Sequence, residues 1–254
     1  YIRVFRASAP VKIAFQNAQA TFSQKGYAVS TAIDGKVAPT GNGWAVAPEF
    51  IKPQLASFET KQDLKFKGEK NSLEIGENNL IREHVTINPG TAGDKLKTSI
   101  GNNCLFMISS HVAHDCIIGN NVIIANNVPL GGHVTIEDSV VIGGNSAVQQ
   151  FTRIGRLAMI GGMTGVLKDV IPFGLSIGNR NYLQGLNLIG LRRQKYDNQK
   201  IMGLDKAFKD IFASKNLHEN LSKINGEYKD NELVGEVIKF IEKDKKRPIC
   251  SPLS

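Results

Sequence analysis

One period dominates this sequence. From residue 100 to residue 166 every sixth residue is aliphatic, apart from a single phenylalanine. These positions are Ile100, Phe106, Val112, Ile118, Ile124, Leu130, Ile136, Ile142, Val148, Ile154, Ile160 and Val166. A period of six matches neither the 3.6-residue repeat of a helix nor the two-residue repeat of a strand, so it indicates a repeating architecture.

A second position repeats with the same period. The residue four places after each aliphatic is always small or β-branched: Cys104, Ser110, Cys116, Val122, Val128, Val134, Val140, Ser146, Thr152, Ala158, Thr164 and Val170. Each six-residue unit thus offers one large and one compact side chain to a narrow interior. Glycine often follows the aliphatic, as at Gly101 and Gly119, where we expect a corner that a Cβ would obstruct.

The predicted fold class is mainly β, a parallel β-helix built from hexapeptide repeats. Three units close one triangular coil, so residues eighteen apart stack in neighbouring coils, roughly 4.8 Å apart. The same phase begins earlier, at Ile75, Ile81 and Ile87, and is then interrupted. We therefore predict a β-helix over residues 59–178 with a loop at 88–99, and loops on rigid scaffolds often carry function.

The two ends of the chain follow other patterns. The hexad pattern stops after Pro172, and from Leu204 onwards the aliphatics take helical spacing, which predicts a helical domain of three or more helices at 179–254. Residues 1–58 cannot be phased into hexads, although the first coils of such a solenoid are expected there.

Composition narrows the class of protein. No apolar run is long enough to span a bilayer, and the first residues lack the pattern of a secretory signal. Cys104 and Cys116 occupy compact interior positions, which favours buried thiols and a reducing compartment. A net charge of +8 suits an acidic protein, a phosphate-bearing ligand, nucleic acid or an anionic membrane, or serves solubility alone.

Basic residues gather at both ends of the predicted helical domain. They are Arg192, Arg193, Lys195 and Lys200 at its start and Lys243, Lys245, Lys246 and Arg247 at its end. Most such charges are solvated, but a basic helical face beside a solenoid could dock an acidic protein.

The candidate chemistry lies in a histidine cluster formed by His111, His114, Asp115 and His133. The eighteen-residue spacing stacks His114, Gly132 and Gln150 in one column, with Asp115, His133 and Phe151 beside it. An imidazole next to a glycine amide is a plausible pair of general base and oxyanion donor, and an adjacent carboxylate could orient the ring.

Two other interpretations remain open at this point. The histidines could be ordinary surface residues of a structural, non-enzymatic solenoid, or they could bind zinc between subunits, although no further cysteine or carboxylate completes an obvious ligand set. The sequence contains no phosphate loop, nucleotide fingerprint or serine nucleophile elbow, since its glycines are corner residues.

Several segments resemble one known family in order along the chain. They are Gln62 to Glu69, Ile81 to Thr91, His111 to Asp115, Ala125 to Asn127, Gly131 to His133 and Gly185 to Arg193. They are similar to the UDP-N-acetylglucosamine acyltransferases that open lipid A synthesis. The resemblance covers residues 62 to about 195, and the predicted helical domain that follows is also of the type found in this family.

This resemblance implies a cytoplasmic homotrimer of left-handed β-helices with active sites between subunits. An acyl carrier protein would deliver an (R)-3-hydroxyacyl thioester to the 3-hydroxyl of UDP-N-acetylglucosamine. It implies no metal and no cofactor beyond the carrier protein's own phosphopantetheine, and we expect neither nucleic acid nor stable membrane insertion. His114 would be the base, Asp115 its orienting partner and the Gly132 amide the oxyanion donor.

The resemblance also implies the roles of further residues. Asp63, Lys65, His111, His133 and Gln150 would contact the sugar or pantetheine, and Asn187 and Arg193 the nucleotide. Gly162, by spacing alone a corner glycine, would line the acyl groove. The chain departs from the family at Gln149, where members commonly carry histidine, so that position cannot act as an acid.

Two other enzymes are alternatives, the first a weaker match and the second of another enzyme class. The later N-acyltransferase of the same pathway carries a uridine-binding domain for which the N-terminal segment is too short. A zinc-dependent β-helix hydratase would differ by its metal content.

Overall fold

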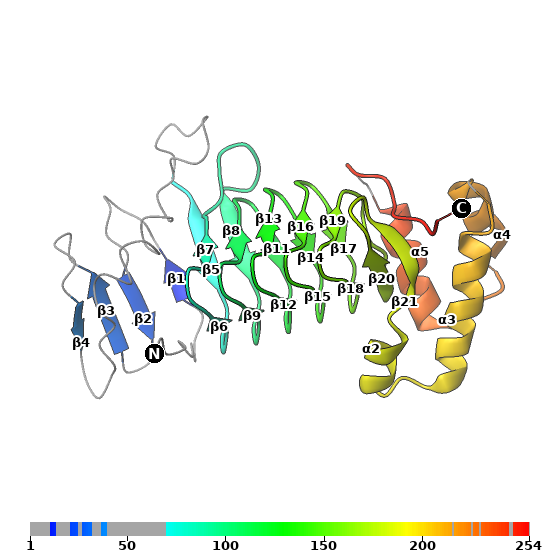
Figure 1. The fold of residues 1–254 in the computed structure, drawn as a ribbon, viewed down its shortest axis with the longest axis horizontal. Helices are drawn as coiled ribbons and strands as arrows, with labels where there is room; N and C mark the ends of the chain where they lie inside the picture. Colours follow the sequence, from blue (N-terminus) through cyan, green and yellow to red (C-terminus); the bar gives the residue numbers. More distant parts are fainter. Residues whose placement is uncertain are drawn as a thin grey trace.

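The computed structural model describes residues 70–253 apart from 215, 225, 229, 244 and 245, together with the backbone of four earlier strands. Its central part is a stack of coils with a helical end (Figure 1). Each coil contributes short strands to three sheets, in which the strands of successive coils pair in parallel; we call them the β8, β9 and β10 sheets after three successive strands. This confirms the predicted parallel β-helix.

The strands of the three sheets recur in strict order. The β8 sheet holds β5 (Ser72–Ile75), β8 (Lys97–Ile100), β11 (Ile117–Ile118), β14 (Thr135–Ile136) and β17 (Arg153–Ile154). The β9 sheet holds β6 (Leu80–Ile81), β9 (Leu105–Phe106), β12 (Ile123–Ile124), β15 (Val141–Ile142), β18 (Met159–Ile160), β20 (Gly174–Ile177) and β21 (Tyr182–Leu186). The β10 sheet holds β7 (Thr86–Ile87), β10 (His111–Val112), β13 (Pro129–Leu130), β16 (Ala147–Val148) and β19 (Gly165–Val166).

The register follows the eighteen-residue spacing. Ile118 pairs with Ile136, and Ile136 with Ile154. All twelve periodic large residues from Ile100 to Val166, and all twelve compact ones from Cys104 to Val170, are buried. Burying such side chains contributes about 1.5–3 kcal/mol for each large one, so the period itself accounts for the stability of the coil.

The corners explain both the glycines and their neighbours. From Ile100 to Ile160 the left-handed conformation falls three residues after each aliphatic, as at Asn103 with φ 58°, and not on the glycine itself. The glycine one place after the aliphatic meets the next coil instead: a Cβ on Gly101 would lie 2.6 Å from the carbonyl oxygen of Gly119. The expected obstruction is therefore close stacking of coils.

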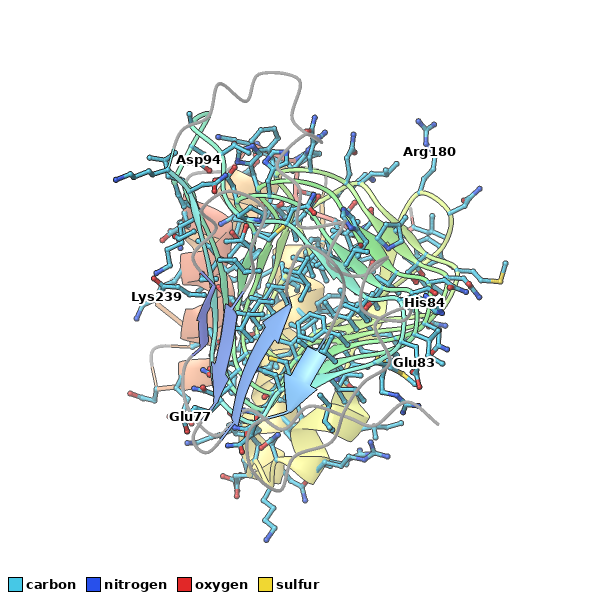
Figure 2. All side chains as sticks on the ribbon, turned by 90° about the vertical axis from the view of Figure 1, so that its left-hand side faces the viewer. Glu77, Glu83, His84, Asp94, Arg180 and Lys239 are labelled. Atoms are coloured by element: carbon cyan, nitrogen blue, oxygen red, sulfur yellow. The ribbon has the colours of Figure 1, made fainter. Side chains whose placement is uncertain are left out.

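Viewed along the solenoid, three labelled residues mark its three corners (Figure 2). Glu77 lies between the β8 and β9 sheets, His84 between the β9 and β10 sheets, and Asp94 in the loop that follows β7. That loop comprises residues 88–96, because β8 already begins at Lys97, so the loop ends three residues earlier than predicted.

The helical end consists of α2 (Leu188–Arg193), α3 (Asn198–Ile211), α4 (Leu217–Ile224) and α5 (Glu232–Glu242), which confirms the predicted helices. Arg156, on a solenoid corner, fixes them. Its guanidinium donates to both carboxylate oxygens of Glu236 at 2.8 and 2.6 Å, and to the Tyr196 hydroxyl at 2.8 Å.

The strands described before residue 70 are β1 (Val11–Ile13), β2 (Thr21–Gln24), β3 (Tyr27–Thr31) and β4 (Val37–Pro39). β1 pairs antiparallel with β5, and β2, β3 and β4 pair antiparallel with one another. These strands differ from the parallel coils expected at 1–58, and the other residues of that segment lie outside the described part of the chain.

Cys104 and Cys116 are free and buried, as predicted from their positions, and so is Cys250. Burial raises the pKa of the Cys104 thiol to about 11, which keeps it protonated and unreactive. Within the described residues, no helix combines the length and the apolar character needed to cross a membrane.

Candidate active site

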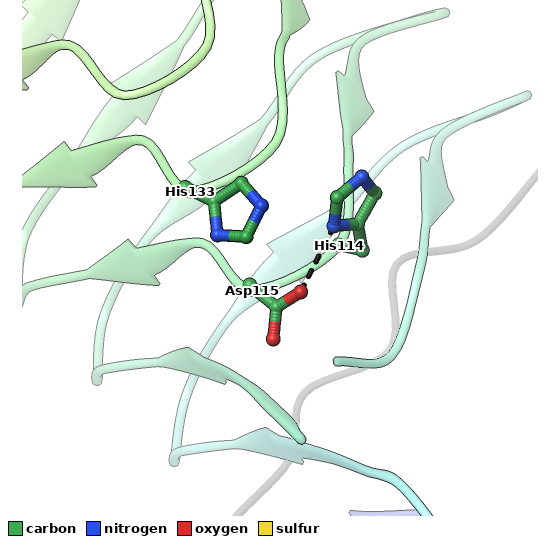
Figure 3. Close-up of side chains that lie close together, drawn as sticks. All are labelled: His114, Asp115 and His133. Atoms are coloured by element: carbon green, nitrogen blue, oxygen red, sulfur yellow. Dashed lines mark hydrogen bonds and ion pairs between the residues drawn. The ribbon is translucent and has the colours of Figure 1, made fainter. Parts of the chain in front are cut away.

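His114 and Asp115 occupy the corner between β10 and β11. The His114 side chain is 28% exposed, whereas that of Asp115 is fully buried, and Nδ1 of His114 lies 2.9 Å from Oδ2 of Asp115 (Figure 3). An ionised carboxylate only accepts hydrogen bonds, so Nδ1 carries a proton, and Nε2 is the ring nitrogen without a partner among the described residues. The predicted orientation of the ring is therefore present.

The loop at 88–96 holds the Asp115 carboxylate in place. The Thr91 amide donates to both carboxylate oxygens at 3.0 and 3.1 Å, the Thr91 hydroxyl donates to Oδ2 at 2.6 Å, and the Lys95 amide donates to Oδ1 at 3.3 Å. Burial acts to raise the pKa of the Asp115 carboxyl, but the hydrogen bonds from Thr91 and His114 outweigh it and keep that pKa below its usual value. Asp115 thus stays ionised.

Gly132 lies directly beside the His114 ring. A Cβ built on Gly132 would be 2.7 Å from Cε1 and 2.8 Å from Nε2 of His114, so the ring keeps this position only beside a glycine. The amide of His133 donates to the carbonyl of His114 at 3.0 Å, which confirms the predicted stacking of these two corners. Gly132 is buried, yet its own N–H meets no acceptor among the described residues. A buried amide without a partner is available to a ligand oxygen.

His133 extends the site away from Asp115. Its ring lies 5.0 Å from the His114 ring and stacks on Phe151 at 4.4 Å with an interplanar angle of 10°. Nδ1 of His133 lies 2.9 Å from Oδ2 of Asp94, which belongs to the same loop as Thr91. The loop at 88–96 therefore reaches both imidazoles: it contacts His133 directly through Asp94, and His114 indirectly through Asp115.

His111 belongs to β10, the strand that precedes His114, and its side chain lies on the outer face of that strand. Its Nδ1 is 2.6 Å from the Thr86 hydroxyl on β7 of the neighbouring coil. Burial lowers the pKa of His111, and the nearby His114 lowers it further, so His111 is neutral near pH 7. A neutral, anchored imidazole suits a hydrogen bond to a sugar or an amide.

The other predicted residues are distributed along the same corner or away from it. Gln149 and Gln150 are exposed, one coil above Gly131 and Gly132. Asn187 caps α2: its side chain accepts from the Gly190 amide at 2.9 Å and donates to the Leu157 carbonyl at 2.9 Å. Arg193 is exposed at the end of α2.

Figure 1 places α2 beyond the last coil, away from the row of β7 and β13. Asn187 and Arg193 therefore do not approach His114 within one chain. Asp63 and Lys65 lie outside the described residues.

Gly162 lies on a different corner from His114. It stacks on Gly144, which stacks on Asn126, as the spacing predicts, because the Met163 and Asn145 amides donate to the Gly144 and Asn126 carbonyls at 2.9 Å. This column separates the β9 and β10 sheets, whereas His114 lies between the β10 and β8 sheets. An acyl tail cannot run from His114 to Gly162 along one column of a single chain.

A metal is the alternative ligand for this cluster. Ligand atoms of His114, Asp115 and His133 all lie within 4.8 Å of one another. Both carboxylate oxygens, however, already accept hydrogen bonds from Thr91, and Nδ1 of each histidine faces a carboxylate. A cation would have to displace these donors, so the site suits proton transfer better than metal binding.

Reading the sequence alone missed the residues that support the site: Thr86, Thr91, Asp94 and Lys95. The interruption of the repeat was a signal that the loop matters, but not which of its residues contact the histidines. The eighteen-residue rule could have paired neither Thr86 with His111 nor Thr91 with Asp115, because the loop shifts the spacing to 25 and 24 residues.

A family model and similar known proteins indicate the same family. The family model described as UDP-N-acetylglucosamine O-acyltransferase, domain 2, matches residues 169–250, and the model of bacterial transferase hexapeptides matches residues 97–132. The acyl-[acyl-carrier-protein]-UDP-N-acetylglucosamine O-acyltransferase of Rhizobium rhizogenes is 47% identical over 80% of this chain and 75% of its own length. That of Paracoccus denitrificans is 47% identical over 80% and 77%.

Solved structures agree with these sequence matches. LpxA from Acinetobacter baumannii has a TM-score of 0.72 and 42% identity, with 74% of each chain covered. The UDP-N-acetylglucosamine acyltransferase from Campylobacter jejuni has a TM-score of 0.69 and 39% identity, with 74% of each chain covered. The resemblance noted in the sequence is confirmed: the chain belongs to the UDP-N-acetylglucosamine O-acyltransferase family.

Proposed function

We propose that this protein transfers an (R)-3-hydroxyacyl chain from acyl carrier protein to the 3-hydroxyl of UDP-N-acetylglucosamine, the first step of lipid A biosynthesis, with His114 as general base. The names of its relatives support the two substrates. One observation supports the mechanism most: the free Nε2 of His114 adjoins the buried, unpartnered amide of Gly132.

The proton and the charge can be followed atom by atom. Nε2 of His114 accepts the proton of the sugar hydroxyl as its oxygen attacks the thioester carbonyl. The Gly132 N–H donates to the developing oxyanion, and Asp115 stabilises the imidazolium through Nδ1. When the tetrahedral intermediate collapses, the C–S bond breaks and His114 returns the proton to the departing pantetheine thiolate. No redox step or bound cofactor is required, because the phosphopantetheine arrives with the substrate.

We further propose a homotrimer in which neighbouring chains complete each site. The outward positions of the β9 sheet form a ladder of apolar side chains: Leu80, Leu105, Ile123, Val141, Met159 and Leu175. In the single chain, Leu80 of this ladder is 39% exposed. A second subunit over such a face would bury it, and would let the Gly162 corner and α2 of one chain approach His114 of another.

The test is direct product analysis. The purified chain is incubated with UDP-N-acetylglucosamine and a mixed pool of 3-hydroxyacyl carrier proteins, and the sugar nucleotide is examined by mass spectrometry. We expect 3-O-acylated product and, for His114→Ala, a kcat lowered by about 10²–10⁴ with the fold and trimer retained.

The matched control is His84→Asn. His84 is an exposed corner histidine whose position is asparagine in later coils, at Asn127 and Asn145, so this variant should retain full activity. Turnover should also survive chelation. A folded His114→Ala variant with near-normal turnover would refute the assigned base, and loss of activity with EDTA would favour the zinc alternative.

A further inference from the structure

The last residues of the chain return to the solenoid and bring two cations with them. The Cys250 amide donates to the Asp169 carbonyl at 2.7 Å, the Asp169 amide to the Pro248 carbonyl at 2.9 Å, and the Leu183 amide to the Ser251 carbonyl at 2.9 Å. The segment thus lies along the last coils, where Figure 1 shows it in red. Lys246 and Arg247 begin this anchored segment.

Both cations lie over the column that carries the candidate active site. Nε of Arg247 donates to the Gln150 carbonyl at 3.0 Å, and Nζ of Lys246 lies 4.5 Å from the centre of the Phe151 ring. Phe151 stacks on His133, which in turn adjoins His114. A continuous run of ring contacts therefore leads from the base to the cations.

Neither cation is neutralised within the described part of the chain. No described carboxylate forms an ion pair with Lys246 or Arg247, although ten other ion pairs are formed, and Arg247 uses only Nε, so its two Nη groups remain donors. Two adjacent cations held by an anchored backbone favour an anion between or beside them. A guanidinium with free Nη groups suits phosphate oxygens in particular.

We propose that Lys246 and Arg247 bind the diphosphate of the sugar nucleotide. This rests on the proposed function, because both of its substrates carry phosphate. The sugar whose 3-hydroxyl meets His114 carries its diphosphate on the same ring, within the roughly 10 Å that two coils span. The phosphodiester of phosphopantetheine lies at the far end of a longer arm, which makes it the less suitable anion for this position.

Calorimetric titration of the purified protein with UDP and with uridine tests the proposal. Lys246→Gln and Arg247→Gln should each weaken UDP binding roughly tenfold, while leaving the affinity for uridine, which lacks phosphate, unchanged. The matched control is Lys239→Gln, an exposed lysine of α5, which should leave UDP binding unchanged. Lys246 is exposed, so its variant decides the question even if loss of Arg247 impairs folding.

The outcomes separate the two phosphate sources. If UDP affinity is unchanged and KM for the acyl carrier substrate rises in both variants, the cations serve phosphopantetheine and the proposal is overturned. It is also overturned if both quantities stay at wild-type values, or if the wild-type protein does not bind UDP. UDP binding that depends on these cations, in a protein that fails to transfer acyl chains, would support the diphosphate site while refuting the proposed reaction.

Discussion

The Thr91 hydroxyl donates a 2.6 Å hydrogen bond to Oδ2 of Asp115, the same oxygen that faces Nδ1 of His114. Thr91 belongs to the loop that interrupts the repeat, and its side chain is buried. The loop therefore acts on the chemistry through Asp115: it fixes the carboxylate, which fixes the imidazole.

Thr91→Val removes this hydroxyl and keeps the side-chain volume. We expect a stability loss of about 1.5–3 kcal/mol, because a buried hydrogen bond to a charged group is lost. If about half of that loss is transmitted to the orientation of His114, kcat falls roughly four- to tenfold. Urea unfolding and steady-state kinetics measure the two effects, and KM for either substrate should hardly change.

The same variant should change the pH dependence of unfolding. The lowered pKa of Asp115 stabilises the fold above the unfolded-state pKa of about 3.9, and this contribution is lost as pH falls through the folded-state pKa. Without the Thr91 hydroxyl the folded-state pKa rises, so acid unfolding should begin at higher pH. Thr91→Ser keeps the hydroxyl and should restore both kcat and the acid midpoint; a serine variant as impaired as valine would contradict this role.

Gly132→Ala tests the contact with His114. The added methyl would lie 2.7 Å from Cε1, so the ring must move away from the oxyanion position. We expect kcat to fall about 10²–10³-fold, similar to the removal of an oxyanion donor. Gly144→Ala is the control, because its Cβ would meet nothing nearer than 3.5 Å. Equal activity of the two variants would argue against the geometry.

Gly162→Met tests the acyl groove. A Cβ there meets the Gly144 carbonyl oxygen at 3.3 Å, so the fold should tolerate the change with a slight shift. We expect kcat/KM for long 3-hydroxyacyl donors to fall by a factor that corresponds to about 1–3 kcal/mol of transition-state binding energy, while short donors are favoured. Competition between donors of graded length measures the profile. An unchanged profile in a folded variant would leave Gly162 as a corner residue only.

Docking of the acidic carrier protein should depend on salt. Arg193 and Lys195 are exposed beside α2 and form no ion pair among the described residues. Since exposed charges are screened within about 8–10 Å at physiological ionic strength, KM for the acyl carrier substrate should rise with salt and in Arg193→Gln. Arg180→Gln, another exposed arginine, serves as the control. A KM indifferent to salt would exclude electrostatic docking.

Much of this protein could be predicted from the sequence because its fold is periodic. A six-residue period determines which side chains face inward, and three units per coil determine which residues stack, so the neighbours His114 and Gly132 follow from counting. The helical end was equally accessible, since the 3.6-residue spacing from Leu204 onwards appears directly in α3, α4 and α5.

The contacts that do not follow from the repeat were determined only by the tertiary structure. Thr91 and Asp94 lie in a loop without period, so only folding brings them to Asp115 and His133. Lys246 and Arg247 reach Phe151 and Gln150 from about a hundred residues away, through hydrogen bonds that anchor the C-terminal segment. A repeat fixes local stacking through a rule that every coil obeys, whereas contacts between aperiodic segments depend on the path of the whole chain.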